Sequence, residues 1–131
     1  MLLREAGERR QKSGVGPVGQ EGDVDPRGRA VRCRCCGHPV THTGERMEVN
    51  GQHEHVCVNP SGIPFHIGCF RAAPGCVPHG PAESYWSWFA GYRWQIALCG
   101  GCGTHLGWAF HGDAPFHGLV MARVVEDDGA S

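Results

Sequence analysis

The sequence has no hydrophobic run long enough to span a membrane. Only Met1, Leu2 and Leu3 precede the first charged residue, an apolar run far shorter than a secretory signal requires. Neither sign of charge dominates, because 12 Lys and Arg residues face 13 Asp and Glu residues. From residue 31 onward there is no lysine, and six arginines stand against eight acidic residues. We therefore expect a cytoplasmic protein without a membrane partner. We also expect no nucleic-acid partner, since the basic stripe that nucleic acid requires is missing.

Periodic apolar residues are also missing from both ends of the chain. Residues 1–30 are rich in Gly, Arg, Glu and Asp, and residues 126–131 have a similar composition. Such segments bury too little apolar surface to offset the entropy lost on ordering. We predict disordered tails over 1–30 and 126–131, and one folded domain over 31–125. A domain of this size has a small core, so a bound metal would add useful stability.

Glycine and proline are frequent instead, and they favour turns and short strands over long helices. Asn50-Gly51 lies between two apolar stretches and is typical of a type I′ hairpin turn. Apolar residues alternate with other residues over 94–98 and over 106–110, which is strand periodicity. A helical turn is predicted only near residues 68–73. We expect a mainly β domain.

Eight cysteines in a reducing compartment indicate metal binding or buried thiols rather than disulfides. Cys33 and Cys36 form one CxxC pair, and Cys99 and Cys102 form another. Two such pairs fill the four positions of a tetrahedral zinc ion, which leaves none for a catalytic water. We predict one structural Zn²⁺ site. Cys35 is a rival ligand within the first pair, at the less favourable CxC spacing.

Two other interpretations of the cysteines compete with the zinc site. The CxxC pairs could be redox motifs, or their thiols could simply be buried. Matching pairs are rare in so short a chain, so both alternatives are less favoured. The remaining cysteines have no CxxC partner and are predicted to be small core residues: Cys57, Cys69 and Cys76.

All four tryptophans fall between Trp86 and Trp108. The CGGC segment would fold the strand of Trp94 back on the strand of Trp108, with Trp88 close in sequence, so three indoles could form a box. On spacing alone, tryptophans that merely fill the core are the favoured interpretation. Each buried indole N–H needs a hydrogen-bond partner, however, which makes several together awkward as filling. A box would suit either a cation or a flat neutral ring.

The cysteines and tryptophans belong to a longer pattern that resembles the thalidomide-binding domain of cereblon, known as the CULT domain. The resemblance runs from about Cys33 to Arg123 and is greatest to single-domain bacterial members. Four segments in order carry it: CRCC at 33–36, VNPSG at 58–62, WFAGYRWQIALCGGC at 88–102 and HLGWAF at 105–110. It implies a β-tent of two antiparallel sheets pinned by a four-cysteine zinc ion.

The resemblance also implies a binding site. Its cage would consist of Trp88, Trp94 and Trp108. Phe110 matches an aromatic residue behind the cage, and Asn59 matches a polar contact at the rim. Trp86 and Ser87 match the segment whose backbone hydrogen-bonds an imide. Ala90 departs from the family's Pro. The implied ligands are cyclic imides, namely glutarimide, thalidomide-type and uracil-type or uridine-like rings, free or at a modified peptide terminus.

The resemblance implies a binding module rather than an enzyme. The chain lacks the protease-like and helical regions through which cereblon joins a ubiquitin ligase, so no ligase subunit is implied as a partner. The alternative is a methionine sulfoxide reductase of the B type, which shares the tent architecture. That enzyme needs a reactive cysteine on a late strand. Residues 116–125 contain none, which leaves Cys57 as the nearest candidate.

Overall fold

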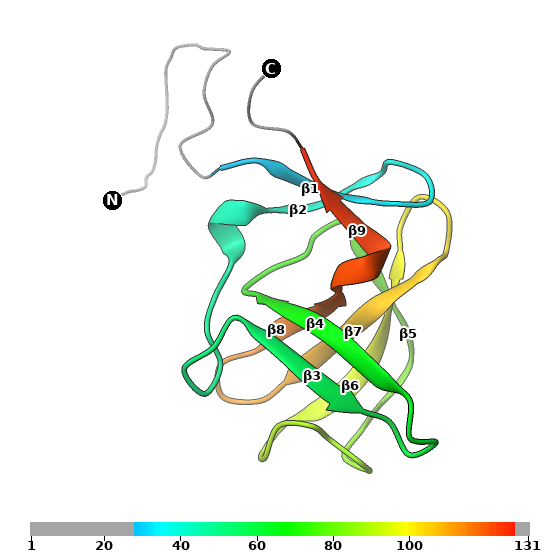
Figure 1. Ribbon diagram of the computed structural model, residues 1–131. Coiled ribbons are helices and arrows are strands. Elements are labelled where there is room, and N and C mark those ends of the chain that lie inside the picture. Colours follow the sequence, from blue (N-terminus) through cyan, green and yellow to red (C-terminus); the bar gives the residue numbers. More distant parts are fainter. Residues whose placement is uncertain (1–27, 128–131) are drawn as a thin grey trace.

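The computed structural model describes residues 28–127. Of the predicted tails over 1–30 and 126–131, residues 1–27 and 128–131 lie outside the described residues. The described chain forms nine strands and two short 3₁₀ helices (Figure 1): β1 Ala30–Cys33, β2 Pro39–His42, η1 Thr43–Glu45, β3 Glu54–Val58, β4 Pro64–Phe70, β5 Cys76–Glu83, β6 Arg93–Cys99, β7 His105–His111, β8 Phe116–Val120, η2 Met121–Arg123 and β9 Val124–Glu126. In this part of the chain, no helix has the length and hydrophobicity that a membrane span requires.

The strands form two antiparallel sheets, which confirms the predicted fold class. The smaller sheet has the order β2-β1-β9, and the larger has the order β3-β4-β8-β7-β6-β5. Figure 1 shows the small sheet at one end of the molecule, above the large one. Val31 pairs with Glu126, and the Asp127 N–H donates to the Ala30 carbonyl at 2.8 Å. The small sheet therefore extends one residue beyond each predicted limit of the folded domain, at 31 and 125.

The predicted helical turn near residues 68–73 was wrong. Residues 68–70 belong to β4, which pairs with β3 on one side and β8 on the other. Pairing on both edges outweighs the weak local preference for a turn. Gly68 also suits this crowded position, because a Cβ there would lie 2.6 Å from the Met121 sulfur.

The type I′ turn is confirmed. Asn50 and Gly51 both have positive φ, at 54° and 83°, as both central residues of that turn require. Val49 and Gln52 close it with a single β-bridge, but the flanking residues do not continue as a hairpin. The following strand, β3, pairs with β4 instead.

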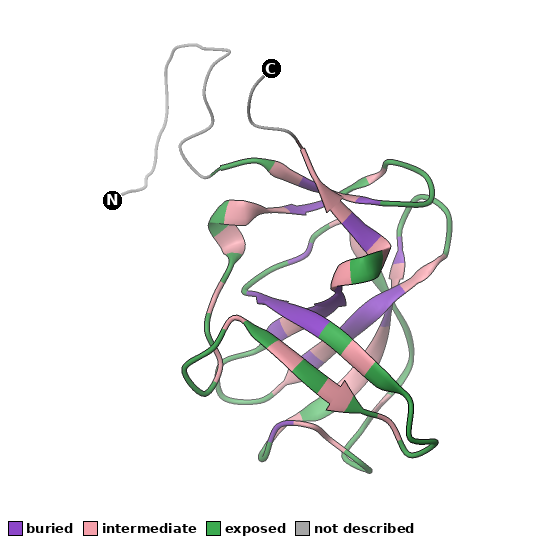
Figure 2. Ribbon diagram, viewed as in Figure 1, coloured by how far each residue is buried: buried purple, intermediate pink, exposed green. Residues whose placement is uncertain are grey.

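The buried residues, purple in Figure 2, form two clusters. The first lies between the two sheets and includes two of the predicted metal ligands: Val31, Cys33, Val40, Phe70, Ala73, Cys99, Leu106, Leu119 and Val124. The second covers one face of the large sheet and is rich in aromatic rings: Ile67, Cys69, Phe89, Trp108, Phe110, Phe116 and Val120. Strand β7 contributes to both clusters, while β6 supplies Cys99 to the first and packs Trp94 and Ile96 against the second. These two strands therefore link the predicted metal ligands to the aromatic residues.

Candidate metal centre and aromatic pocket

The four predicted metal ligands come together at one point. The sulfur atoms of Cys33, Cys36, Cys99 and Cys102 all lie within 4.8 Å of one another. Across the two pairs, Cys33 lies 3.8 Å from Cys102, and Cys36 lies 3.6 Å from Cys99. A tetrahedron with metal–sulfur bonds of about 2.3 Å has edges of about 3.8 Å. The cluster is therefore able to hold one metal ion, and exposed Cys35 lies outside it.

Both CxxC segments use the same turn. The Gly37 N–H donates to the Cys33 carbonyl at 2.8 Å, and the Gly103 N–H donates to the Cys99 carbonyl at 2.9 Å. Both glycines have φ near 80°, a left-handed conformation that is costly for other residues. The repeated turn points the two sulfur atoms of each pair toward the same centre.

The electrostatics of the cluster favour a cation. Hydrogen bonds from Thr104 lower the pKa of the Cys102 thiol to about 6, so this sulfur carries thiolate character. Burial raises the pKa of Cys33. Four thiolates this close would repel one another in the absence of a positive ion. A bound metal removes that repulsion, because it deprotonates its thiol ligands.

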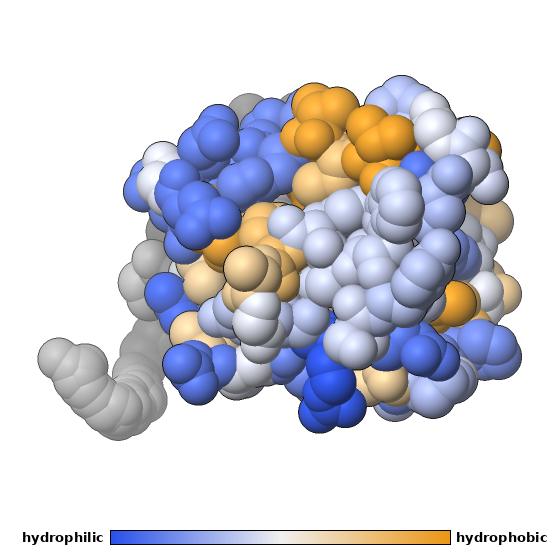
Figure 3. Space-filling view, turned by 90° about the horizontal axis from the view of Figure 1, so that it is seen from below, coloured by the Kyte–Doolittle hydropathy of each residue, from blue (hydrophilic) through white to orange (hydrophobic). Residues whose placement is uncertain are grey.

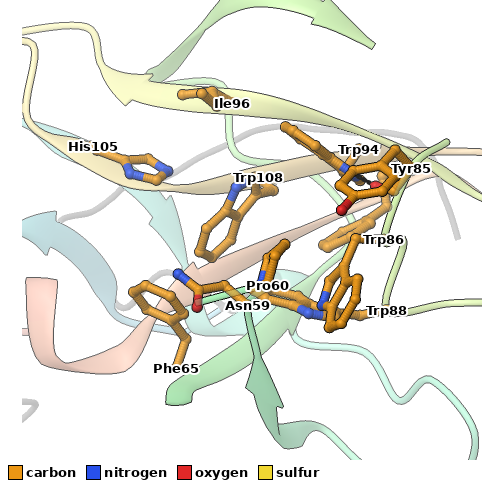
Figure 4. A pocket seen from close by; sticks show the side chains of 11 residues that line it. Asn59, Pro60, Phe65, Tyr85, Trp86, Trp88, Trp94, Ile96, His105 and Trp108 are labelled. Atoms are coloured by element: carbon orange, nitrogen blue, oxygen red, sulfur yellow. Dashed lines mark hydrogen bonds between the residues drawn. The ribbon is translucent and has the colours of Figure 1, made fainter. Parts of the chain in front are cut away.

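A cavity of about 490 Å³ opens beside the β6–β7 hairpin. Its walls come from β4, β6, β7 and the loops after β3 and β5, and Figure 4 shows their side chains converging on it. Six of the seven predicted ligand-binding residues line it: Asn59, Trp86, Trp88, Trp94, Trp108 and Phe110. Ser87 does not, because its hydroxyl donates to the Phe89 carbonyl at 3.0 Å. Ligand contact by any of the seven stays a prediction.

The indole rings leave a slot within the cavity. Trp88 and Trp108 meet edge to face, with ring centroids 4.8 Å apart. Trp94 pairs across the sheet with Phe110, two residues along from the pair of Ile96 and Trp108. Among the described residues, its ring forms no stacked or edge-to-face pair with Trp88 or Trp108. Atoms in contact lie about 3.5–4 Å apart, so a flat ring fits between walls separated by roughly twice that distance.

Backbone carbonyls hold three of the four indoles in place. The indole N–H groups of Trp86 and Trp88 both donate to the Val58 carbonyl, each at 2.9 Å. The indole of Trp94 donates to the carbonyl of Tyr85. The fourth indole N–H, on Trp108, has no hydrogen-bond partner within residues 28–127. The need of buried indole N–H groups for hydrogen-bond partners is thus met for three of the four tryptophans.

The segment between β5 and β6 carries a strained residue. Trp86 has a φ of 56°, which a bulky side chain rarely adopts. In the described part of the chain, its carbonyl has no hydrogen-bond donor, and the N–H of Trp88 has no acceptor. Strain and unpaired backbone groups together are typical of binding sites.

Asn59 shapes the rim of the pocket. Its side-chain oxygen accepts from the N–H groups of Ser61 at 3.0 Å and Ile63 at 2.9 Å. These bonds fix the loop between β3 and β4, and they leave the amide NH₂ without a partner among residues 28–127. Around this rim the protein exposes large apolar side chains, including Ile63 and half of Trp86. Figure 3 shows hydrophobic patches within the largely polar surface on this side.

Five lining residues were not predicted: Pro60, Phe65, Tyr85, Ile96 and His105. Ile96 alternates with Trp94, so strand periodicity already placed it on the same face. Phe65 reaches Trp108 because β4 and β7 flank β8, an arrangement for which the sequence held no comparable signal.

The pocket lining contains no Lys, Arg, Asp or Glu. Burial lowers the pKa of its one imidazole, His105, so this ring is neutral at physiological pH. A cation would find aromatic faces here but no carboxylate. The lining therefore suits a neutral ligand.

The fold and the site define a small β domain with a four-thiol metal centre and an aromatic pocket. No family model matches the sequence. Cereblon proteins of Drosophila erecta and Drosophila yakuba are each 31% identical over 102 residues, which cover 70% of this chain and 17% of the relative. Cereblon of Drosophila melanogaster is 30% identical over a similar length. The chain thus spans about a sixth of these curated relatives, and it contains a cereblon-like domain of the CULT type.

The metal centre can be tested with two adjacent exposed cysteines. After dialysis against a competing chelator, Cys36→Ser is expected to lose most of its metal, because only three sulfur ligands remain. Cys35→Ser is the matched control and should keep about one metal ion per chain, like the unmodified protein. Elemental analysis of the purified proteins measures the metal content of both variants. Metal lost from Cys35→Ser and retained by Cys36→Ser would contradict the assignment.

Proposed function

We propose that this domain is a non-enzymatic binding module for a neutral cyclic imide. The ring would lie in the slot between Trp94 and the pair formed by Trp88 and Trp108. The observation that carries the proposal is the combination of this slot with the unpaired carbonyl of Trp86 and the unpaired N–H of Trp88. The CULT resemblance supports it, because that family takes imides at the matching positions.

The unpaired polar groups complement an imide edge. An imide presents carbonyl, N–H and carbonyl in a row, so it needs a donor, an acceptor and a second donor. The Trp88 N–H and the Trp86 carbonyl supply the first two. The indole N–H of Trp108 and the amide of Asn59 are available as the second donor. Glutarimide, thalidomide-type and uracil-type or uridine-like rings all carry this edge, free or at a modified peptide terminus.

We propose zinc as the ion of the four-thiol centre, because tetrahedral sulfur coordination is typical of structural zinc. Cys33, Cys36, Cys99 and Cys102 would hold it and leave no position open for water, so its contribution is stability rather than catalysis. Zinc binding in small domains is worth on the order of 10 kcal/mol. The free thiols at the remaining cysteines are consistent with a reducing cytoplasm.

Methionine sulfoxide reduction is the less favoured function. Cys57 lies on β3, outside the pocket lining, and burial raises the pKa of its thiol. A nucleophilic cysteine needs the opposite shift, toward the thiolate. Strand β8 contains no cysteine beside the pocket. We propose no ubiquitin-ligase partner for this domain, and no nucleic-acid or membrane partner.

Imide binding is expected to quench tryptophan fluorescence and raise the melting temperature. Glutarimide and thalidomide should both do so. Trp94→Ala should weaken binding by roughly 30-fold or more, because truncating a central aromatic contact costs about 2 kcal/mol or more. Titration calorimetry gives the affinities, and zinc content checks that the variant is folded.

Tyr92→Phe is the matched control for that experiment. Tyr92 is an aromatic residue near Trp94 that does not line the pocket, and its hydroxyl donates to the Ala114 carbonyl at 3.2 Å. This variant should bind imide like the unmodified protein. Native affinity in Trp94→Ala would mean that the tryptophans are core residues and would overturn the proposal.

The enzyme alternative predicts turnover of methionine sulfoxide with a dithiol reductant, lost in Cys57→Ser. We expect no turnover above a protein-free blank, because the Cys57 thiol is neither in the pocket nor activated. Methionine formation, measured by chromatography, decides between a binding module and a reductase. Turnover that depends on Cys57 would favour the reductase.

A further inference from the structure

The cavity is larger than a single imide ring requires. Its 490 Å³ correspond to roughly sixteen waters at about 30 Å³ each. A glutarimide ring has about half that number of non-hydrogen atoms. Figure 4 shows Trp108 in the middle of the pocket, with Trp94, Tyr85 and Trp86 toward one side and His105 and Phe65 toward the other. We call the space lined by Phe65, Ile96 and His105 the side compartment.

Trp108 is in contact with both parts of the cavity. Its ring meets Trp88 in the cage at 4.8 Å. It also meets His105 at 4.9 Å and Phe65 at 5.2 Å, both edge to face. A ring held against Trp108 in the cage would therefore have the side compartment within reach of a short substituent.

His105 presents an acceptor to this compartment. Its Nε2 lies 2.9 Å from the Gly107 carbonyl, and that contact requires Nε2 to carry the proton. Burial, with Arg123 nearby, lowers the pKa of His105 and keeps the ring neutral. Nδ1 is then a hydrogen-bond acceptor, and it has no partner among the residues that the structure describes.

The guanidinium of Arg123 lies close to two residues of the side compartment, His105 and Phe65. Arg123 donates to the His105 carbonyl at 2.9 Å, and its guanidinium carbon lies 5.7 Å from the centre of the Phe65 ring. Its positive charge disfavours a second cation beside His105. A ligand group in the compartment should thus be a neutral donor.

We propose that His105 determines specificity by accepting a hydrogen bond at Nδ1 from a neutral donor group, such as a hydroxyl, carried by the imide ring. This inference rests on the proposed function, because the ring in the cage fixes where its substituent lies. The chemical class of ligand is therefore a cyclic imide with a short hydroxylated substituent, rather than a bare or cationic one.

The test compares glutarimides that differ only in the substituent, placed at ring carbon 3 or 4: hydroxymethyl, ethyl of equal size, and charged aminomethyl. With the full chain in calorimetry, the hydroxymethyl compound should bind five- to tenfold more tightly than the ethyl compound at one of the two positions, and the aminomethyl compound more weakly than ethyl. In His105→Phe the hydroxymethyl-to-ethyl ratio should fall to about one. His79→Phe, an exposed control on β5, should keep the ratio of the unmodified protein.

Three results would overturn the proposal: equal affinities of the hydroxymethyl and ethyl compounds at both positions, a ratio retained in His105→Phe, or a ratio also lost in His79→Phe. If His105→Phe does not fold, His105→Leu provides the same comparison. Unsubstituted glutarimide is measured first. Its failure to bind would refute the proposed function itself, whereas glutarimide binding without the expected ratio would refute only the role of His105.

Discussion

The aromatic pocket depends on the closure of one hairpin by four cysteine sulfurs. Strands β6 and β7 are joined by the turn that contains Cys99 and Cys102, and these strands carry Trp94 and Trp108. The other two sulfurs arrive from β1 and the turn after it, with 62 residues between Cys36 and Cys99. A metal ion there would tie the small sheet to the hairpin and offset the entropy of closing that long loop. It would fix the separation of two cage walls without contacting the ligand.

The second constraint is the hydrogen bonding of the indoles. A cage of tryptophans exposes apolar faces to its ligand and must satisfy each indole N–H elsewhere. Here one carbonyl, that of Val58, receives two of them, and Tyr85 receives a third. Val58 lies at the end of β3, so these bonds attach the loop before β6 to the opposite edge of the large sheet. This attachment stabilises the left-handed conformation of Trp86, a pocket-lining residue whose carbonyl has no hydrogen-bond donor among residues 28–127.

Local signals predicted the parts of this arrangement that lie close together in sequence. CxxC spacing and flanking glycines identified the four cysteines that cluster, and alternation placed Trp94 and Trp108 on paired strands. The sequence could not reveal pairings between distant segments. The contribution of Phe65 and the side compartment both require β7 to approach β4 across β8. The same tertiary pairing made residues 68–70 a strand, and a local turn directed the Ser87 hydroxyl to Phe89 rather than to the pocket.

The central claim is that the metal centre sets the geometry of the aromatic cage, and metal removal tests it most directly. Imide affinity would be measured by calorimetry on protein stripped with a chelator, and again after one equivalent of zinc is returned. The account predicts that the stripped protein shows no measurable binding and that zinc restores the original affinity. Stripped protein that bound imide with native affinity would contradict it, because the cage would then be independent of the four cysteines.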